Sequence, residues 1–313
     1  MMVLFLLVGL VLLYFGAEWL VKGSSRFALR HGVSSLVVGL TIVAFGTSAP
    51  ELVVSVRSAL SGFGNIAVGN VVGSNIFNIA AILGISAIIC PLKVHIKVIR
   101  LDMPIVLAAS MLLVFFLRNG AIERFEALIL LAGIIVYTVT TIKLGKRESV
   151  ELAIPQVDKS AGKVNGSNFA DAGFTFLGLG LLIVGSQLFV KGAVDLARMM
   201  SISDAVIGLT IVAAGTSLPE LATSIVAAIK GEQDIAVGNI VGSNIFNILA
   251  IIGISGTITP LDASGIGNVD LLIMAVMAAV LIPLMKTGLK ISRGEGSFLL
   301  VSYCAYVWHL WPV

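Results

Sequence analysis

The chain has 313 residues, of which 58% are hydrophobic and only 12% are charged. Soluble domains carry about 25% charged residues, so an ordinary soluble protein is excluded. The apolar excess, together with only two cysteines, also excludes a disordered chain or a disulfide-rich scaffold. The net charge of +3 is too small to indicate a nucleic-acid partner. We therefore expect an all-α integral membrane protein that contacts the lipid bilayer.

Ten apolar segments are separated by loop signals, and about 20 apolar residues are enough to span a bilayer as a helix. The predicted spans are, in chain order, 2–21, 33–60, 65–90, 101–117, 124–142, 171–190, 203–229, 234–259, 268–285 and 296–312. The first segment has no basic leader and no small-residue cleavage site. We expect it to be a retained helix rather than a signal peptide.

The second half of the chain repeats the first with an offset of 169 residues. Of the 41 positions in 39–79, 28 are identical in 208–248. Each copy holds five predicted spans, and because five is odd, the second copy enters the membrane from the opposite side. We predict ten transmembrane helices in two inverted five-helix repeats, 1–142 and 170–313, joined by a polar linker at 143–169.

The distribution of lysine and arginine predicts the orientation in the membrane. With the N-terminus outside, 15 of the 20 Lys and Arg residues lie in cytoplasmic segments and five lie outside. Cytoplasmic loops of membrane proteins carry such an excess of positive charge. We therefore expect a multi-pass protein of the cell membrane with both termini extracellular and the linker cytoplasmic.

Two acidic residues lie in the middle of predicted spans. Glu51 ends the motif Gly-Thr-Ser-Ala-Pro-Glu, and Glu220 ends Gly-Thr-Ser-Leu-Pro-Glu at the matching position. A carboxylate at mid-membrane costs about 2.5–3.5 kcal/mol on insertion scales, so such residues are usually functional. We interpret two other acids as structural: Glu18, whose counterpart is Gln187, and Asp102, as a charge at a helix N-terminus.

Each of the two glutamates directly follows a proline. Pro50 and Pro219 have no N–H group, so the carbonyls of Gly46 and Gly215, four residues earlier, lose their helical donors. We expect both helices to bend or break here and to leave carbonyl oxygens near the membrane midplane. A Gly-Pro kink is also a common packing device in membrane helices, but its duplication with an acid favours a functional site.

The spans that follow the glutamates add oxygen-bearing side chains. Ser74 and Asn78 lie one helical turn apart, as do Ser243 and Asn247. Two carboxylates with hydroxyl, amide and backbone oxygens, and without nitrogen or sulfur ligands, favour Ca²⁺ or Na⁺. Further asparagines in these spans fit either ligation or hydrogen bonding between helices. They are Asn70, Asn75, Asn239 and Asn244.

Gly-Thr-Ser-x-Pro-Glu followed by Gly-Ser-Asn-x-x-Asn, present in both halves, resembles the repeats of the sodium/calcium exchanger family. The resemblance covers essentially the whole chain. It implies an antiporter rather than an enzyme, without a cofactor, in which Ca²⁺ and Na⁺ compete for sites between the repeats. Glu51 and Glu220 would be the principal Ca²⁺ ligands. The other implied ligands are Thr47, Ser48, Ser74, Thr216, Ser217 and Ser243, the carbonyls of Ala44 and Ala213, and, at the centre, Asn78 and Asn247.

The sequence departs from parts of the family pattern. Potassium-dependent members carry Asp at the position of Asn247, whereas both halves here have Asn. The linker is also too short for the large Ca²⁺-sensing domains of animal exchangers. The resemblance therefore implies K⁺-independent Na⁺/Ca²⁺ exchange, and no obligate protein partner is evident.

Three other functions are alternatives to Na⁺/Ca²⁺ exchange. The nearest is a H⁺/Ca²⁺ antiporter using the same carboxylates, although that related branch usually carries Gly-Asn-x-x-Glu. An intramembrane hydrolase would need a nucleophile–base pair or a histidine metal site, and the sequence offers neither. A passive channel would conduct Ca²⁺ without any counter-ion.

Overall fold

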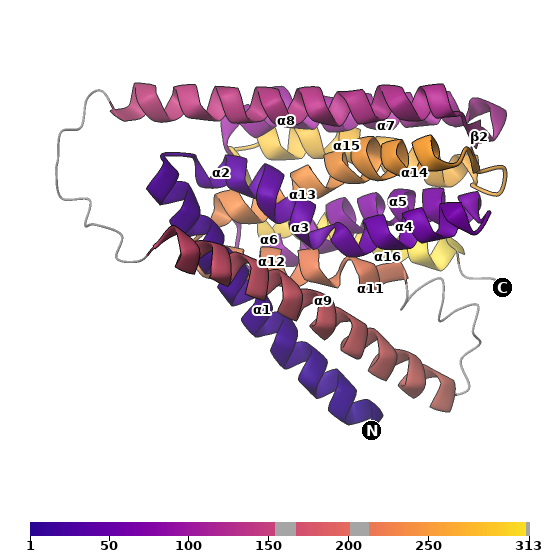
Figure 1. Ribbon diagram of the computed structural model, residues 1–313, viewed down its shortest axis with the longest axis horizontal. Helices are drawn as coiled ribbons and strands as arrows, with labels where there is room; N and C mark the ends of the chain where they lie inside the picture. Colours follow the sequence, from indigo (N-terminus) through magenta and orange to yellow (C-terminus); the bar gives the residue numbers. More distant parts are fainter. Residues whose placement is uncertain (154–166, 201–212, 311–313) are drawn as a thin grey trace.

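The computed structural model describes residues 1–153, 167–200 and 213–310, and this part is helical apart from loops and four two-residue strands (Figure 1). The elements of the first half are α1 (Met2–His31), α2 (Ser35–Val38), a π-helical turn (Gly39–Val43), α3 (Ala44–Thr47), α4 (Ala49–Leu60), α5 (Gly64–Ile76), a π-helical segment (Phe77–Ile82), α6 (Leu83–Ile89), β1 (Leu92–Lys93), a π-helical turn (Val98–Asp102), α7 (Met103–Phe116), a 3₁₀ turn (Leu117–Asn119), β2 (Ala121–Ile122) and α8 (Arg124–Ala153). Those of the second half are α9 (Asn168–Met199), α11 (Ala213–Thr216), α12 (Leu218–Ile229), α13 (Gln233–Phe246), a π-helical segment (Asn247–Ile252), α14 (Gly253–Ile258), β3 (Leu261–Asp262), α15 (Asn268–Lys286), β4 (Lys290–Ile291) and α16 (Arg293–Leu310).

Several helices are long and apolar enough to cross a bilayer. Within the described residues, seven helical segments meet this requirement, and the bent pair Ser35–Thr47 with Ala49–Leu60 makes an eighth. α1, α8 and α9 leave most of their length unburied, as lipid-facing helices do, whereas the segment Gln233–Ile258 is enclosed by protein along its whole apolar stretch. The protein is therefore a multi-pass membrane protein with α13 and α14 at its centre.

α1 and α9 lie side by side, and the pair projects from the rest of the bundle (Figure 1). They run antiparallel, since Gly9 meets Gly185 and Gly16 meets Gly178. A Cβ added at Gly178 would lie 2.5 Å from a backbone nitrogen of α1, so these glycines allow the two backbones to touch. Gly178 and Gly185 are the counterparts of Gly9 and Gly16 at the offset of 169 residues. The two halves therefore contribute equivalent glycines to this contact.

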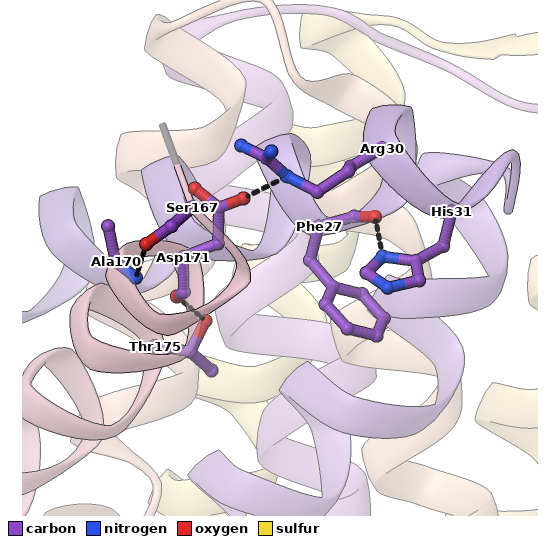
Figure 2. A network of polar contacts seen from close by, with 7 residues as sticks. All are labelled: Phe27, Arg30, His31, Ser167, Ala170, Asp171 and Thr175. Atoms are coloured by element: carbon purple, nitrogen blue, oxygen red, sulfur yellow. Dashed lines mark hydrogen bonds and ion pairs between the residues drawn. The ribbon is translucent and has the colours of Figure 1, made fainter. Parts of the chain in front are cut away.

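An ion pair joins α1 and α9 at one end of the pair (Figure 2). Arg30 Nε donates to Asp171 Oδ2 at 2.8 Å, and the Asp171 side chain is fully buried. Thr175 Oγ1 donates to the Asp171 carbonyl at 2.9 Å. The repeat counterparts of Arg30 and Asp171 are Met199 and Met2, so the sequence cannot form the same ion pair at the other end.

Four short strands connect the two halves. β1 pairs antiparallel with β4, with Leu92 opposite Ile291, and β2 pairs antiparallel with β3, with Ile122 opposite Leu261. At the offset of 169 residues, β3 is the counterpart of β1 and β4 is the counterpart of β2. The two strand pairs are therefore equivalent. The structural correspondence between the halves thus extends beyond the repeated sequence motifs.

Part of the expected linker is helical, and one sequence-based interpretation requires correction. α8 continues to Ala153, so residues 143–153 of the expected linker are helical, and 154–166 lie outside the described residues. This stretch is rich in Lys, Glu, Leu and Arg, which favour helix regardless of where the membrane ends. Asp102 is not a charge at a helix N-terminus, because helical structure already begins at Val98. It is fully buried and accepts a hydrogen bond from Tyr137 Oη at 3.0 Å.

The predicted spans of the second half agree with the observed helices to different extents. α12 and α15 cover large parts of the predicted spans 203–229 and 268–285, although residues 201–212 lie outside the described ones. α16 covers most of the predicted span 296–312, but it is not one of the seven apolar segments in the described part of the chain. The number of ten spans thus stays a prediction.

Candidate ion-binding site

Two helix breaks face each other at the centre of the protein. α3 ends at Thr47 and α4 begins at Ala49, with a bend of 46° between the two helical stretches. Ser217 separates α11 from α12 in the same way. Proline near the start of α4 and of α12 explains both breaks, because it cannot donate to the preceding turn. The predicted bend or break before each glutamate is therefore confirmed.

The carboxylate that follows each break is held by the serine at the other break. Ser48 Oγ donates to Glu220 Oε1 at 2.8 Å, and Ser217 Oγ donates to Glu51 Oε1 at 2.8 Å. The hydroxyl oxygens of Ser217 and Ser74 are 3.2 Å apart. Both glutamates and both break serines are 0% exposed. The two halves thus build one polar centre, and each glutamate also lies in the first turn of a helix, where the dipole favours negative charge.

Asparagine amides hold the two glutamate-bearing helices against their neighbours. Asn239 Nδ2 donates to the Glu220 carbonyl at 3.4 Å and to Ser224 Oγ at 3.1 Å. Asn239 Oδ1 accepts from Thr47 Oγ1 at 3.0 Å. The first half repeats this arrangement between Asn70 and the Glu51 carbonyl, Ser55 Oγ and Thr216 Oγ1. For Asn70 and Asn239 the structure therefore supports hydrogen bonding between helices.

Several buried oxygens at this centre have no hydrogen-bond partner within the described part of the protein. They are Glu51 Oε2, Glu220 Oε2, Ser243 Oγ, Asn78 Oδ1 and Asn247 Oδ1. A buried polar atom without a partner costs about 1–3 kcal/mol, and an unpaired buried charge costs more. Carboxylate, hydroxyl and amide oxygens of this kind are ligands that a hard cation takes. Among the described residues, no three His, Cys, Asp or Glu side chains gather.

The other residues that the sequence predicts as ligands differ in their burial and hydrogen bonding. Thr47 is fully buried, and Thr216 is half-buried. The Ala44 carbonyl accepts from the Ser48 N–H at 3.0 Å and from Thr47 Oγ1 at 3.4 Å. Ala213 is the first residue of α11 and therefore precedes the second break, as Ala44 precedes the first. Its side chain lies outside the described ones.

One contact of the second break escaped the sequence analysis. Ser186 Oγ, on α9, donates to the Gly215 carbonyl at 2.6 Å, which is the carbonyl that loses its helical donor to Pro219. The repeat counterpart of Ser186 is Ala17, so comparison of the two halves could not reveal this contact.

A cavity of about 410 Å³ lies beside the second break. α4, α9 and α11 line it, with Pro50, Ser186, Gly215 and Thr216 among the lining residues. Thr216 belongs to both the cavity wall and the hydrogen-bonded centre. The cavity therefore adjoins the second helix break.

These features define an integral membrane protein with a buried, oxygen-rich centre between its two halves, an arrangement typical of ion transporters. The family model described as "Sodium/calcium exchanger protein" matches residues 1–143 and 171–311. The chain belongs to the sodium/calcium exchanger family. This confirms the family expected from the motifs.

Relatives of known name agree with this assignment. The "Putative antiporter CaxA" of Alkalimonas amylolytica is 39% identical over 97% of this chain and 96% of its own length. The "Sodium/calcium exchanger MaX1" of Methanosarcina acetivorans is 32% identical over 97% of both chains. The solved structure of the sodium-calcium exchanger NCX_Mj, soaked with Na⁺ and Ca²⁺, has a TM-score of 0.85 and 33% identity and covers 99% of both chains. Human "Sodium/potassium/calcium exchanger 1" is 50% identical, but over only 24% of this chain and 7% of its own.

Proposed function

We propose that this protein is a Na⁺/Ca²⁺ antiporter that uses a Na⁺ gradient to move Ca²⁺ across the cell membrane by alternating access. The observation that carries the proposal is the pair of fully buried carboxylates, Glu51 and Glu220, each held by a serine of the opposite half. The relatives MaX1 and NCX_Mj, both named as sodium/calcium exchangers, support Ca²⁺ and Na⁺ as the ions.

The ligand set fits hard cations. Carboxylate, hydroxyl, amide and carbonyl oxygens are the ligands that Ca²⁺ takes, and Na⁺ is likewise a hard cation. In this proposal the ions bind to Glu51 and Glu220 and to oxygens of Thr47, Ser48, Ser74, Asn78, Thr216, Ser217, Ser243 and Asn247, together with the carbonyls of Ala44 and Ala213.

Exchange rather than leak follows from the charge at this centre. Glu51 and Glu220 carry two negative charges when ionised, and one Ca²⁺ or a set of Na⁺ ions neutralises them. Since both ions need the same oxygens, a full complement of both cannot bind together. The ion-free carboxylates are costly to move through a low-dielectric membrane, which opposes a return step without a counter-ion.

We further infer that the two halves are inverted repeats, with both termini outside and the linker 143–169 inside. The antiparallel contact of α1 with α9 supports this, because these helices are repeat counterparts. The equivalent strand pairs β1–β4 and β2–β3 give independent support. Inverted repeats with broken helices at their interface are typical of secondary transporters.

The proposal is tested by ⁴⁵Ca²⁺ uptake into proteoliposomes that hold the purified protein under imposed ion gradients. We expect an outward Na⁺ gradient to drive uptake and a pH gradient without Na⁺ to have no effect. Uptake driven by the pH gradient alone would instead identify a H⁺/Ca²⁺ antiporter. Uptake that persists with no counter-ion gradient would identify a channel.

A further inference from the structure

Hydrogen bonds among three asparagines form a relay between the central helices. The side chain of Asn75, on α5, donates through Nδ2 to the backbone carbonyl of Asn244, on α13, at 3.2 Å. Asn75 Oδ1 accepts from Asn247 Nδ2 at 3.0 Å. All three residues are buried, with at most 1% of their surface exposed. The relay therefore crosses from one half of the chain to the other without contact with solvent.

The chemistry of the relay determines which way each amide points. A backbone carbonyl can only accept, so the Asn75 atom beside Asn244 must be the NH₂ group. The Asn75 oxygen then faces Asn247 and can only accept, so the Asn247 NH₂ group faces it. This leaves Asn247 Oδ1 on the other side, buried and with no hydrogen-bond partner in the described part of the chain. The order of donors and acceptors thus presents a bare oxygen.

The other half of the protein lacks this relay, although its sequence is the same. Asn244 is the counterpart of Asn75, but its Nδ2 donates to the Ile240 carbonyl of its own helix at 2.7 Å. Neither amide atom of Asn78, the counterpart of Asn247, has a hydrogen-bond partner among the described residues. One central amide is therefore oriented by a neighbour, and the other is not.

We propose that Asn75 is a positioning residue that holds the Asn247 amide with its oxygen toward the cation. This inference rests on the proposed function, since it concerns how the site binds Ca²⁺. In this proposal Asn75 acts through Asn247, because its oxygen accepts from Asn247 and its nitrogen donates to a backbone carbonyl. Without Asn75, Asn247 can rotate its NH₂ group toward the ion, and a donor there opposes a cation.

The test measures Ca²⁺ binding to purified protein by the Ca²⁺-dependent rise of its unfolding temperature, and Ca²⁺ exchange in proteoliposomes. We expect Asn75→Ala to weaken the apparent Ca²⁺ affinity about tenfold, while the maximal rate at saturating Ca²⁺ changes less than about twofold. Asn75→Leu, which keeps the volume without polar atoms, is expected to do the same. Ser110→Ala is the control, because it also removes a buried side-chain hydrogen bond, made to the carbonyl four residues earlier in its own helix, and we expect its affinity to stay within about twofold of the wild type.

A double-mutant cycle separates orientation from packing. In Asn247→Asp, both side-chain oxygens are acceptors, so no orientation is needed. We expect the effect of Asn75→Ala in that background to fall below about twofold. A tenfold loss that persists there, or an unchanged affinity in Asn75→Ala alone, would overturn the positioning role. A wild-type protein that Ca²⁺ does not stabilise would overturn the proposed function, and the inference with it.

Discussion

At the scale of single residues, the proposed ion binding rests on two carboxylates that have no contact with solvent. Glu51 and Glu220 each use one oxygen to accept from a serine, and the other oxygen has no hydrogen-bond partner among the described residues. Such oxygens can serve a cation without first breaking a hydrogen bond. Each carboxylate therefore combines a fixed position with a ligand atom that is available.

The first prediction concerns these two carboxylates. Glu51→Gln and Glu220→Gln should each nearly abolish Na⁺-driven ⁴⁵Ca²⁺ uptake, because the amide fits the same space but lacks the charge that balances Ca²⁺. The amide oxygen can still accept from Ser217 or Ser48, so both variants should remain folded, as size-exclusion profiles in detergent would show. Near-normal exchange in Glu51→Gln would disprove the proposed site.

Glu18→Gln provides the matched control for that experiment. Glu18 Oε1 lies 2.6 Å from Lys230 Nζ, but both side chains are about one-third exposed. An exposed ion pair contributes about 0–1 kcal/mol, and the counterpart Gln187 already shows that an amide is tolerated there. Exchange by Glu18→Gln should therefore be close to that of the wild type.

At the scale of helices, the most extensive contact among the described elements is between α1 and α9. At Gly9 and Gly178 the nearest atoms that an added Cβ would meet belong to the backbone of the other helix, which cannot move aside as a side chain can. Such contacts replace the hydrophobic effect, which cannot drive one apolar helix against another in lipid. The pair is therefore held by close contact along its length and by the Arg30–Asp171 ion pair at one end.

The second prediction tests this packing with two glycines of the same helix. Gly178→Ala would bring a methyl group to 2.5 Å from the backbone of α1, whereas a Cβ on Gly180 has no heavy atom within 4 Å. We expect Gly178→Ala to destabilise the protein by about 1–3 kcal/mol. Gly180→Ala should leave stability unchanged or raise it by up to about 1 kcal/mol. Thermal unfolding in detergent measures both, and equal effects would refute the close contact.

At the scale of the whole molecule, the positive charges predict the orientation in the membrane. The third prediction is that a cysteine at Ser160 reacts only from the cytoplasmic side, because residues 143–169 link the two halves there. The assay needs a background without the native thiols, since Cys90 and Cys304 are both free. Efficient labelling of Ser160→Cys by an impermeant reagent on intact cells would invert the proposed topology.

The fourth prediction concerns potassium. The central charge is −2, and one Ca²⁺ balances it, because Asn78 and Asn247 are neutral amides. No further charge remains to recruit K⁺, so replacing K⁺ by choline on both sides should leave Na⁺-driven Ca²⁺ flux unchanged. Asn247→Asp should alter the ion preference without changing the fold. Exchange that stops when wild-type protein loses K⁺ would contradict this charge argument.

Local and compositional signals in the chain were enough for the membrane class, the family, the internal duplication and the two helix breaks. Hydropathy and repetition are properties of the amino-acid order itself. A proline removes a hydrogen-bond donor wherever it stands, so the breaks before Glu51 and Glu220 need no tertiary information. The resemblance to the family implied that Ser48, Ser74 and Ser217 belong to the same site as those glutamates. That each glutamate accepts from the serine of the opposite half was shown only by the structure.

The packing of distant elements decided the rest. Ser186 reaches the Gly215 carbonyl, and Asp102 is buried against Tyr137, because helices far apart in the chain meet there. Asn75 and Asn244 occupy the same place in identical motifs, yet Asn75 joins the two halves and Asn244 bonds within its own helix. A hydrogen bond between helices depends on their distance and rotation, and neither quantity leaves a periodic trace in the amino-acid order. Two identical motifs can therefore perform unequal tasks once the helices around them are packed.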